Sequence, residues 1–357
     1  HLPKDMVSRA DWLSVAFDEA KGRIKGDSRV QVTVKGQDRP QFAYTYQLAE
    51  EKKGNGDGKP QPGETFAMYL VVKNVGKGKA TGGQASVRNL SGDGLLLHEG
   101  RFDVALNPGE SKKLKFTFDI NKPPAGDDEV KLELTLADRD LRETVVEKVR
   151  MPISAPIAVA NGGGSKKAGG AGATLLEAPE AGARSFARLP GGTAATVLGT
   201  AGEFTKLALG DGRFAFAKST ELEAGGAPTP TVAFDDVFGH SPPSIEIAAP
   251  PLAVRDTHFL LKGSADDTAR ILDGYIFVGS KKVFYQSNRN GANPKKMDFS
   301  ADLPLRPGIN VITVIARETP DTIGRKVFIV RRDAPDGTPM VTPKNEEDLG
   351  ETGGDDD

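Results

Sequence analysis

The chain has 357 residues, more than one hydrophobic core usually organises, so two or three domains are expected. Lysine and arginine (47) nearly balance aspartate and glutamate (49), and a net charge of -2 gives no field that attracts nucleic acid or anionic lipid. Cysteine is absent, which excludes disulfides, thiolate metal sites and a cysteine nucleophile. No stretch approaches the roughly 20 apolar residues of a membrane-spanning helix, so no such segment is expected.

The first segment predicts a helix from Ser8 to Lys25. Ser8 and Asp11 have the spacing of a capping box, and Gly26 supplies a stop. An apolar stripe follows at helical spacing, formed by Leu13, Ala16, Phe17, Ala20 and Ile24. A lone helix cannot bury such a stripe. Residues 1–29 are therefore expected to be the last element of a domain that lies further upstream.

From Val30 the apolar period changes to two, which predicts strands. The alternating runs cover residues 30–34, 42–46, 66–72, 114–120 and 130–136. Turns such as Asn107-Pro108-Gly109 separate them at sandwich spacing. We therefore expect an immunoglobulin-like β-sandwich over residues 30–156.

Two flexible linkers are predicted around a small barrel. Residues 157–172 contain NGGGSKKAGGAG, which is rich in glycine and lacks large apolar side chains. Its exposed lysines, Lys166 and Lys167, make it the expected site of first internal proteolysis. Residues 173–224 have short strands and tight turns, as in a little barrel. A second linker, 225–242, follows, and both linkers are expected to let the modules move.

The last domain, residues 243–333, is predicted to be a second immunoglobulin-like β-sandwich. Its apolar pairs alternate in successive short runs, and Arg306-Pro307-Gly308-Ile309-Asn310 forms a turn before a central strand. Residues 334–357 are polar and end in three aspartates, so they are expected to be disordered. The fold class is therefore mainly β, with two sandwiches flanking a small barrel and one N-terminal helix.

No catalytic template fits the sequence. Walker, G-x-S-x-G, H-E-x-x-H and G-x-G-x-x-G patterns are missing. The four histidines (His1, His98, His240 and His258) are scattered singly, so a shared site would need several segments to converge. We therefore expect no catalytic residues in this chain.

The segment from Lys53 to Glu64 approaches a calcium-loop template at Asn55, Asp57, Gly58 and Glu64. Lys53 stands where the template requires aspartate, and no helix is predicted on either side. We expect a tight inter-strand turn and no cofactor, with a calcium site at Asn55, Asp57 and Glu64 as the alternative.

Three stretches resemble known bacterial domains. Residues 55–120, with NGDG, PGE, FAMYLVVKNVGKGKA and LNPGES, resemble adhesion-type immunoglobulin-like domains. Leu261 to Asp267 and Leu305 to Arg317 are similar to the strand–turn patterns of other immunoglobulin-like modules. Residues 187–216 resemble a bacterial SH3-like domain, with Phe204 where that family usually has tryptophan. The SH3 resemblance implies Phe204, Phe214 and Phe216 as binding residues; the alternative is that they form the barrel core.

The predicted order of helix, sandwich, barrel and sandwich, opening on LPKDMVSRADWLSVAFDEAKGRIKGD, resembles the region downstream of a peptidase domain. The family is the PDZ-containing carboxyl-terminal processing (tail-specific) serine peptidases of Gram-negative bacteria. The resemblance implies an extracytoplasmic protein of the periplasm or cell envelope whose catalytic residues lie upstream.

The sequence thus predicts a non-catalytic binding and spacer region of an envelope serine peptidase. Its expected partners are a protein or peptide, peptidoglycan, or the upstream peptidase and PDZ domains, and not nucleic acid. The alternatives are a stand-alone surface adhesin or cell-wall-binding protein, and an enzyme whose site lies between domains.

Overall fold

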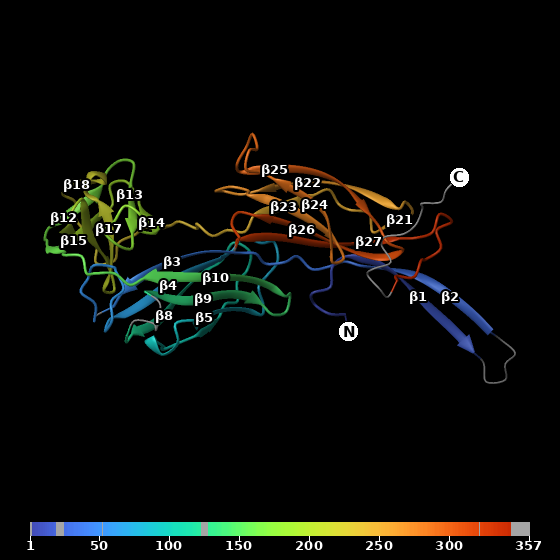
Figure 1. The fold of residues 1–357 in the computed structure, drawn as a ribbon, viewed down its shortest axis with the longest axis horizontal. Helices are drawn as coiled ribbons and strands as arrows, with labels where there is room; N and C mark the ends of the chain where they lie inside the picture. Colours follow the sequence, from blue (N-terminus) through green and yellow to red (C-terminus); the bar gives the residue numbers. More distant parts are fainter. Residues whose placement is uncertain (1, 19–24, 52, 123–127, 321, 344–357) are drawn as a thin grey trace. The chain divides into compact units, whose positions relative to one another are not determined.

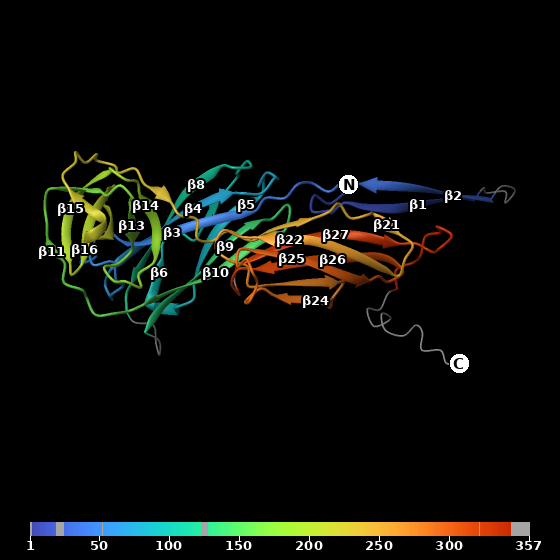
Figure 2. The same cartoon turned by 90° about the horizontal axis from the view of Figure 1, so that it is seen from above.

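The computed structural model describes residues 2–18, 25–51, 53–122, 128–320 and 322–343. The chain divides into two compact units: one comprises residues 39–241, and the other combines residues 1–38 with 242–357. Both are built almost entirely from antiparallel strands (Figure 1 and, from above, Figure 2). The expected mainly β fold is therefore confirmed. Within the described residues the only helical segments are two short 3-10 turns, Gly92–Gly94 and Ser219–Glu221.

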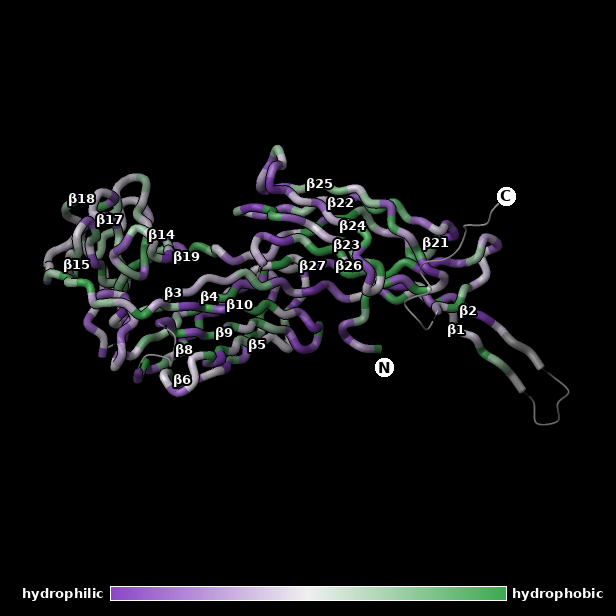
Figure 3. The backbone as a smooth tube through the Cα atoms, in the orientation of Figure 1, coloured by the Kyte–Doolittle hydropathy of each residue, from purple (hydrophilic) through white to green (hydrophobic). Residues whose placement is uncertain are grey.

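In the unit of residues 39–241, the first sandwich consists of two four-stranded sheets, ordered β3-β4-β8-β6 and β10-β9-β5-β7. The alternating residues face a shared core, where Tyr46, Phe66, Phe116 and Phe118 are at most 1% exposed. Figure 3 shows this alternation of hydrophobic and hydrophilic positions along the strands. The strand bounds are β3 (Phe42–Glu50), β4 (Thr65–Asn74), β5 (Gly83–Asn89), β6 (Leu95–Leu97), β7 (Arg101–Asp103), β8 (Ser111–Ile120), β9 (Glu129–Asp138) and β10 (Glu143–Pro152).

The second part of the same unit, here called the barrel, is a curved sheet of short strands around its own core. Its strand order is β18-β12-β15-β16-β17-β13-β14-β19, and β11 also pairs with β15. The strand bounds are β11 (Ala160–Asn161), β12 (Ser165–Ala168), β13 (Ala173–Leu176), β14 (Ser185–Leu189), β15 (Ala194–Ala201), β16 (Phe204–Gly210), β17 (Arg213–Lys218), β18 (Leu222–Ala224) and β19 (Asp235–Asp236).

The prediction of a linker over residues 157–172 is wrong at its centre. Strand β12 contains Lys166 and Lys167 and is hydrogen-bonded on one side to β15 and on the other to β18. The glycines around it act as turn residues, since Gly164 and Gly172 have φ angles of 80° and 79°. The glycines of this segment therefore form tight turns between strands and do not make a flexible linker.

The predicted linker over residues 225–242 also belongs to the folded unit. Val232 is 4% exposed in the barrel core, and β19 pairs with β14. Residue His240 forms a bridge with Tyr44 of the first sandwich. The sandwich and the barrel are therefore one unit, and the expectation that linkers let them move is wrong for this pair.

The second sandwich, in the other unit, packs the sheet β20-β22-β25 against the sheet β21-β27-β26-β23-β24. Six of its strands follow the predicted runs. The sequence interpretation missed two, the short β21 and β25, although Met297, Phe299, Ala301 and Leu303 alternate in β25. The strand bounds are β20 (Ser244–Ile247), β21 (Ala253–Val254), β22 (His258–Asp266), β23 (Asp273–Val278), β24 (Lys281–Ser287), β25 (Lys296–Pro304), β26 (Gly308–Arg317) and β27 (Ile323–Arg332).

The predicted N-terminal helix is wrong, because the segment forms a hairpin of β1 (Arg9–Asp18) and β2 (Lys25–Val34). The Ser8 hydroxyl does not cap a helix but accepts a hydrogen bond from the Gly36 amide at 2.9 Å. The helical stripe hid a second pattern of period two, in which Leu13 lies opposite Val30. Strand β1 pairs with β2 over its whole length. Residues 30–34 therefore belong to this hairpin and not to the first sandwich. Ala20 and Ile24 lie outside the described residues.

The first part of the predicted disordered tail is folded. The Ala334 amide donates to the Thr338 carbonyl at 2.9 Å, and the Ile309 amide donates to the Thr342 hydroxyl at 2.8 Å. These bonds hold residues 334–342 against the second sandwich. Residues 344–357 lie outside the described residues.

Candidate ligand-binding cleft

Strand β3 carries the attachment of the barrel to the first sandwich. Its even-numbered residues face the sandwich core, so Thr45 and Gln47 face the opposite way, toward the barrel. The Thr45 hydroxyl donates to the Phe186 carbonyl at 3.3 Å, and the Gln47 Nε2 donates to the Phe214 carbonyl at 2.7 Å. Both side chains are buried, at 5% and 2% exposure. The outward face of this sheet is therefore an internal interface.

The free edge of β3 is also occupied. The Tyr44 amide donates to the His240 carbonyl at 2.8 Å, and the Leu48 amide donates to Glu177 Oε1 at 2.6 Å. The His240 ring stacks on Tyr44 with centroids 4.8 Å apart. Burial lowers the pKa of His240, against the opposing effect of the Glu147 carboxylate.

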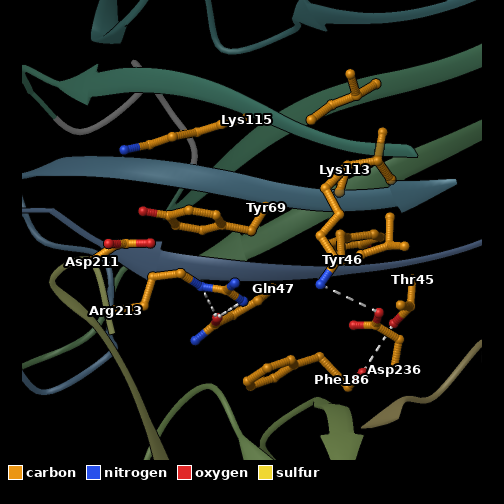
Figure 4. Close-up of a pocket in the computed structure, with 13 residues that line it drawn as sticks. Thr45, Tyr46, Gln47, Tyr69, Lys113, Lys115, Phe186, Asp211, Arg213 and Asp236 are labelled. Atoms are coloured by element: carbon orange, nitrogen blue, oxygen red, sulfur yellow. Dashed lines mark hydrogen bonds and ion pairs between the residues drawn. The ribbon is translucent and has the colours of Figure 1, made fainter. Parts of the chain in front are cut away.

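A cleft of about 260 Å³ opens where the β3-β4-β8 face meets the barrel. Figure 4 shows tyrosine and lysine side chains from the sandwich on one side, and phenylalanine, arginine and aspartate from the barrel on the other. The residues that line it are Thr45, Tyr46, Gln47, Tyr69, Leu70, Val71, Lys113, Leu114, Lys115, Phe186, Asp211, Arg213 and Asp236.

Arg213 is the central cation of this cleft. Its guanidinium carbon lies 4.2 Å from the Tyr69 ring centroid and 5.5 Å from that of Phe234. Its Nε and one terminal nitrogen donate to Gln47 Oε1 at 3.1 and 2.6 Å (Figure 4). Burial lowers the pKa of Arg213, although nearby Tyr69 and carboxylates act in the opposite direction. None of the carboxylates in the described part of the chain forms an ion pair with it.

Two lysines at the rim of the cleft, Lys113 and Lys115, already lie near acidic side chains. Lys115 Nζ lies 2.9 Å from Glu51 Oε1, which also accepts a 2.7 Å bond from the Tyr69 hydroxyl. Lys113 Nζ is 4.0 Å from Asp236 Oδ2, and burial raises the pKa of Asp236. Asp211 adds a third carboxylate to the lining and acts electrostatically on Arg213. Arg213 is nevertheless the lining cation that forms no ion pair with a described carboxylate.

A buried cluster of ionisable groups lies behind the cleft, around Glu147 of β10. Its carboxylate accepts the Tyr44 and Tyr46 hydroxyls at 2.6 and 2.8 Å. The Arg184 guanidinium carbon lies 4.1 Å from the Tyr46 ring centroid and its nitrogens lie 3.8–3.9 Å from Glu177 and Glu147. Burial raises the pKa of Glu177 to about 7, against the opposing effect of Arg184. This cluster links Tyr44, Tyr46 and Glu147 of the sandwich to Arg184 and Glu177 of the barrel.

The loop considered for calcium forms a turn whose oxygens accept backbone N–H groups. Asn55 Oδ1 accepts the Asp57 amide at 2.9 Å, and Asp57 accepts the Lys59 amide at 2.8 Å and the Ile157 amide at 2.7 Å. The Glu64 carboxylate accepts the Asn55 and Gln61 amides at 3.2 and 3.0 Å.

Calcium binding at the same loop stays a hypothesis. The described residues hold no group of three His, Asp or Glu side chains placed to bind a metal. A cation is nevertheless present, because Lys206 Nζ of the barrel donates to the Gly56 carbonyl at 2.6 Å. Its ammonium lies near the buried carboxylates, and burial together with the charge of Glu64 raises the pKa of Glu50 to about 7. The loop therefore serves as a contact between sandwich and barrel.

The three phenylalanines implied by the SH3 resemblance are interior residues. Phe204, Phe214 and Phe216 are 4%, 7% and 0% exposed and form a small cluster with Leu176. Lys206 Nζ lies 3.8 Å from the Phe214 ring centroid and covers it. They therefore lack the exposed surface that a ligand needs. Their burial agrees with the alternative interpretation, in which they form the core of the barrel.

Each of the three described histidines, His98, His240 and His258, contacts its own set of residues. His98 Nε2 lies 2.9 Å from Asp119 Oδ2, and the Thr65 hydroxyl donates to the other oxygen of that carboxylate at 2.6 Å. Both groups thus bond the same acid, so the imidazole is not placed to deprotonate the hydroxyl. His258 contacts only the neighbouring Thr257 hydroxyl, at 3.1 Å, and His1 lies outside the described residues.

The sequence interpretation missed every residue that distinguishes the cleft. Tyr69 and Lys115 are the outward members of predicted alternating strands, and outward residues ordinarily face solvent. Arg213 follows a Gly-Asp-Gly turn, which marks a hairpin and not a site. The available signal was the polar residue Gln47 beside aromatic residues in a strand that is buried on both faces.

No family model and no curated protein matches the chain. Among solved structures, a Ca2+-stabilised adhesin that helps an Antarctic bacterium to bind ice has 9% identity and a TM-score of 0.22, covering 91% of this chain and 81% of that one. The insect immune protein hemolin, solved with implications for homophilic adhesion, has 10% identity and a TM-score of 0.19, covering 81% and 77%. These TM-scores are too low for inferences about function. Within the described residues, no helix has the length and apolar character needed to cross a membrane.

Proposed function

We propose that the chain is a non-catalytic binding region and that the cleft between the first sandwich and the barrel holds its ligand. The observation that supports this is Arg213, which lies between Tyr69 and Phe234 and has no carboxylate partner among the described residues. A guanidinium whose plane is fixed by stacking and by Gln47 is pre-organised to bind a carboxylate.

The size and the walls of the cleft favour a peptide. A volume of about 260 Å³ suits one or two side chains of an extended segment and is small for a large cofactor. Aromatic walls at Tyr69 and Phe186 offer area for apolar contact. The ligand proposed here is therefore a polypeptide segment with one acidic side chain near an apolar one.

The test compares two capped pentapeptides, one with a central glutamate next to phenylalanine and one with glutamine in its place. We expect the glutamate peptide to bind the full chain about tenfold more tightly in calorimetric titration, because it forms a charge-assisted pair. In the variant R213Q the two peptides should bind alike. The control R101Q removes an exposed arginine from the opposite sheet and should preserve the difference. Absence of heat with either peptide at millimolar concentration would refute the proposal.

We further propose that this binding region belongs to an extracytoplasmic serine peptidase of the carboxyl-terminal processing type and positions the catalytic domain. The support is the resemblance in domain order; the N-terminal element that contributed to it is a hairpin. The coding sequence upstream of His1 decides between this context and a stand-alone adhesin, because only the former places PDZ and peptidase sequence there.

A further inference from the structure

The hairpin of β1 and β2 is a sheet that no other described strand completes. Its two strands pair with each other over ten residues and form a separate two-stranded sheet (Figure 1). A hairpin of two strands is only marginally stable in water, because half of its backbone groups and its two faces lack partners. Among the described residues, no strand pairs with the outer edge of β2. The hairpin is therefore an element that needs a further strand.

The two edges of the hairpin differ, because the second sandwich holds β1 at its base. The Ala10 carbonyl accepts a hydrogen bond from a terminal nitrogen of Arg331 at 2.7 Å, and Ala10 is 2% exposed. The Arg331 guanidinium carbon also lies 5.6 Å from the Trp12 ring centroid. By contrast, residues 28–31 of β2 are all exposed. The edge that stays open to another strand is therefore that of β2.

The open edge has the composition of a strand that recruits other strands. Its last five residues, 30–34, read Val-Gln-Val-Thr-Val. Four of the five are β-branched, and the segment contains no charge, proline or glycine, which is the composition of segments that pair edge to edge. A β-bulge does not protect this edge either, since the register of β2 against β1 runs without a shift. The strand thus lacks the usual devices that prevent pairing.

Exposed apolar side chains lie on one face of the hairpin. Leu13 and Val30 are directly opposite each other and are 56% and 53% exposed. Val15, on the same face of β1, is 44% exposed. A solvated sheet face is ordinarily polar, so apolar side chains gathered on it mark an interaction surface. A strand added beside β2 would cover Val30, which is the member of this group next to the open edge.

The sequence of β2 is complementary to itself when two copies run antiparallel. With Val30 opposite the same residue of the second copy, Arg29 lies opposite Gln31, and Ser28 lies opposite Val32. Like charges therefore do not oppose each other along residues 28–32, and the two valines form a β-branched cross-strand pair. An arrangement of this kind has a two-fold axis, so it closes with two chains.

We propose that β2 pairs antiparallel with β2 of a second copy of this chain, around Val30, and forms a continuous four-stranded sheet in a two-fold dimer. Backbone hydrogen bonds of the added strand supply the affinity, and the side chains set the register. An edge pairing of this length is a small interface, so we expect a dissociation constant on the order of 10 µM. This interface lies in the unit of residues 1–38 and 242–357 and is independent of the cleft in the other unit.

The first test is the mass of the full chain in sedimentation equilibrium at about 100 µM, well above the expected dissociation constant. We expect the wild type to approach the mass of a dimer. The variant V30K places two ammonium groups opposite each other and should be a monomer. Its folding can be checked by the fluorescence of Trp12, the single tryptophan, which lies in the same hairpin.

A matched control is V146K, which makes the same change at an exposed valine of β10 and should stay a dimer. A dimeric V30K would overturn the proposal. A monomeric wild type would also overturn it, and would leave the edge of β2 to a strand of another protein.

Single cysteines test the register, because the chain has none of its own. Only the residue at the two-fold axis lies opposite itself, with Cα atoms about 4.5–5.5 Å apart, which a disulfide can bridge. V30C should therefore form a disulfide-linked dimer on mild oxidation. In S28C the two cysteines would be about 13 Å apart along the strands, and in L13C about 14 Å apart across three strand spacings, so neither should crosslink. Failure of V30C to crosslink, or faster crosslinking of L13C, would overturn the pairing of β2 around Val30.

Discussion

Glu177 shows what one buried side chain does at the junction of sandwich and barrel. Its carboxylate accepts the Leu48 amide and lies 3.8 Å from Arg184, yet burial raises its pKa to about 7. Nothing in the sequence around Glu177 distinguishes it from a solvated acid, because its burial depends on β3, which lies 129 positions away. Core residues such as Phe116, by contrast, could be predicted, since strand periodicity alone places them inside.

The pKa of Glu177 predicts how stability depends on pH. The folded chain keeps a proton that the unfolded chain releases above its ordinary value of 4.5. The stabilisation from this group is therefore complete below pH 4.5 and is lost as pH rises through 7. At pH 8 the variant E177Q should be more stable than the wild type by about 3 kcal/mol, and at pH 4.5 equally stable. Denaturant unfolding at the two pH values measures this, with exposed E203Q as the control. An equal offset at both pH values would contradict the assignment.

At the scale of elements, local pattern was reliable where alternation was long and unreliable where glycine dominated. Strands β3, β4, β8 and β9 lie where period-two runs predict them. The hairpin β1–β2 was missed because Leu13, Ala16 and Phe17 satisfy a helical period as well, and only pairing with residues 25–34 decides between the two. Strand β12 was missed because it has four residues and lies between glycine turns, so its partners, and not its own composition, make it a strand.

Strand β12 leads to a prediction about proteolysis. Lys166 and Lys167 are hydrogen-bonded to neighbouring strands on both sides, so a protease cannot bind this segment in the extended form that it needs without breaking the sheet. In limited trypsin digestion, cleavage after these two lysines should follow cleavage elsewhere and should appear only as residues 39–241 unfold. Mass spectrometry of the time course identifies the order. An early fragment ending at Lys166 or Lys167 would contradict the strand.

At the scale of the whole molecule, the barrel and the first sandwich form a single folding unit. Contacts between them include those of Gln47 with Phe214, Asp57 with Ile157, and Lys206 with Gly56. The sequence predicted two sandwiches and a barrel but not this union, because each contact joins residues that are 100 or more positions apart. The candidate cleft exists only because of that union, which explains why its residues were not predicted.

Because the sandwich and the barrel form one unit, a substitution in the loop of residues 53–64 should lower the stability of both. Asp57 is fully buried and accepts amides from Lys59 and Ile157, so D57A should remove about 1–3 kcal/mol from the unit of residues 39–241. Calorimetry should show one transition for this unit moving to lower temperature, while Trp12 fluorescence, which follows the other unit, stays unchanged. The control is D235A, which removes an exposed acid of the same unit. A barrel that melts separately from the sandwich would contradict a single unit.

The cover over the outer edge of β3 has a consequence for solubility. An edge strand with free amides is a template on which other chains assemble, and β3 is nine residues long and strongly apolar. The His240 carbonyl and the Glu177 carboxylate occupy the Tyr44 and Leu48 amides that such a strand would offer. Residues of the barrel thus cover the edge of β3. A first sandwich produced without the barrel would expose this edge, and other copies of the chain could pair with it.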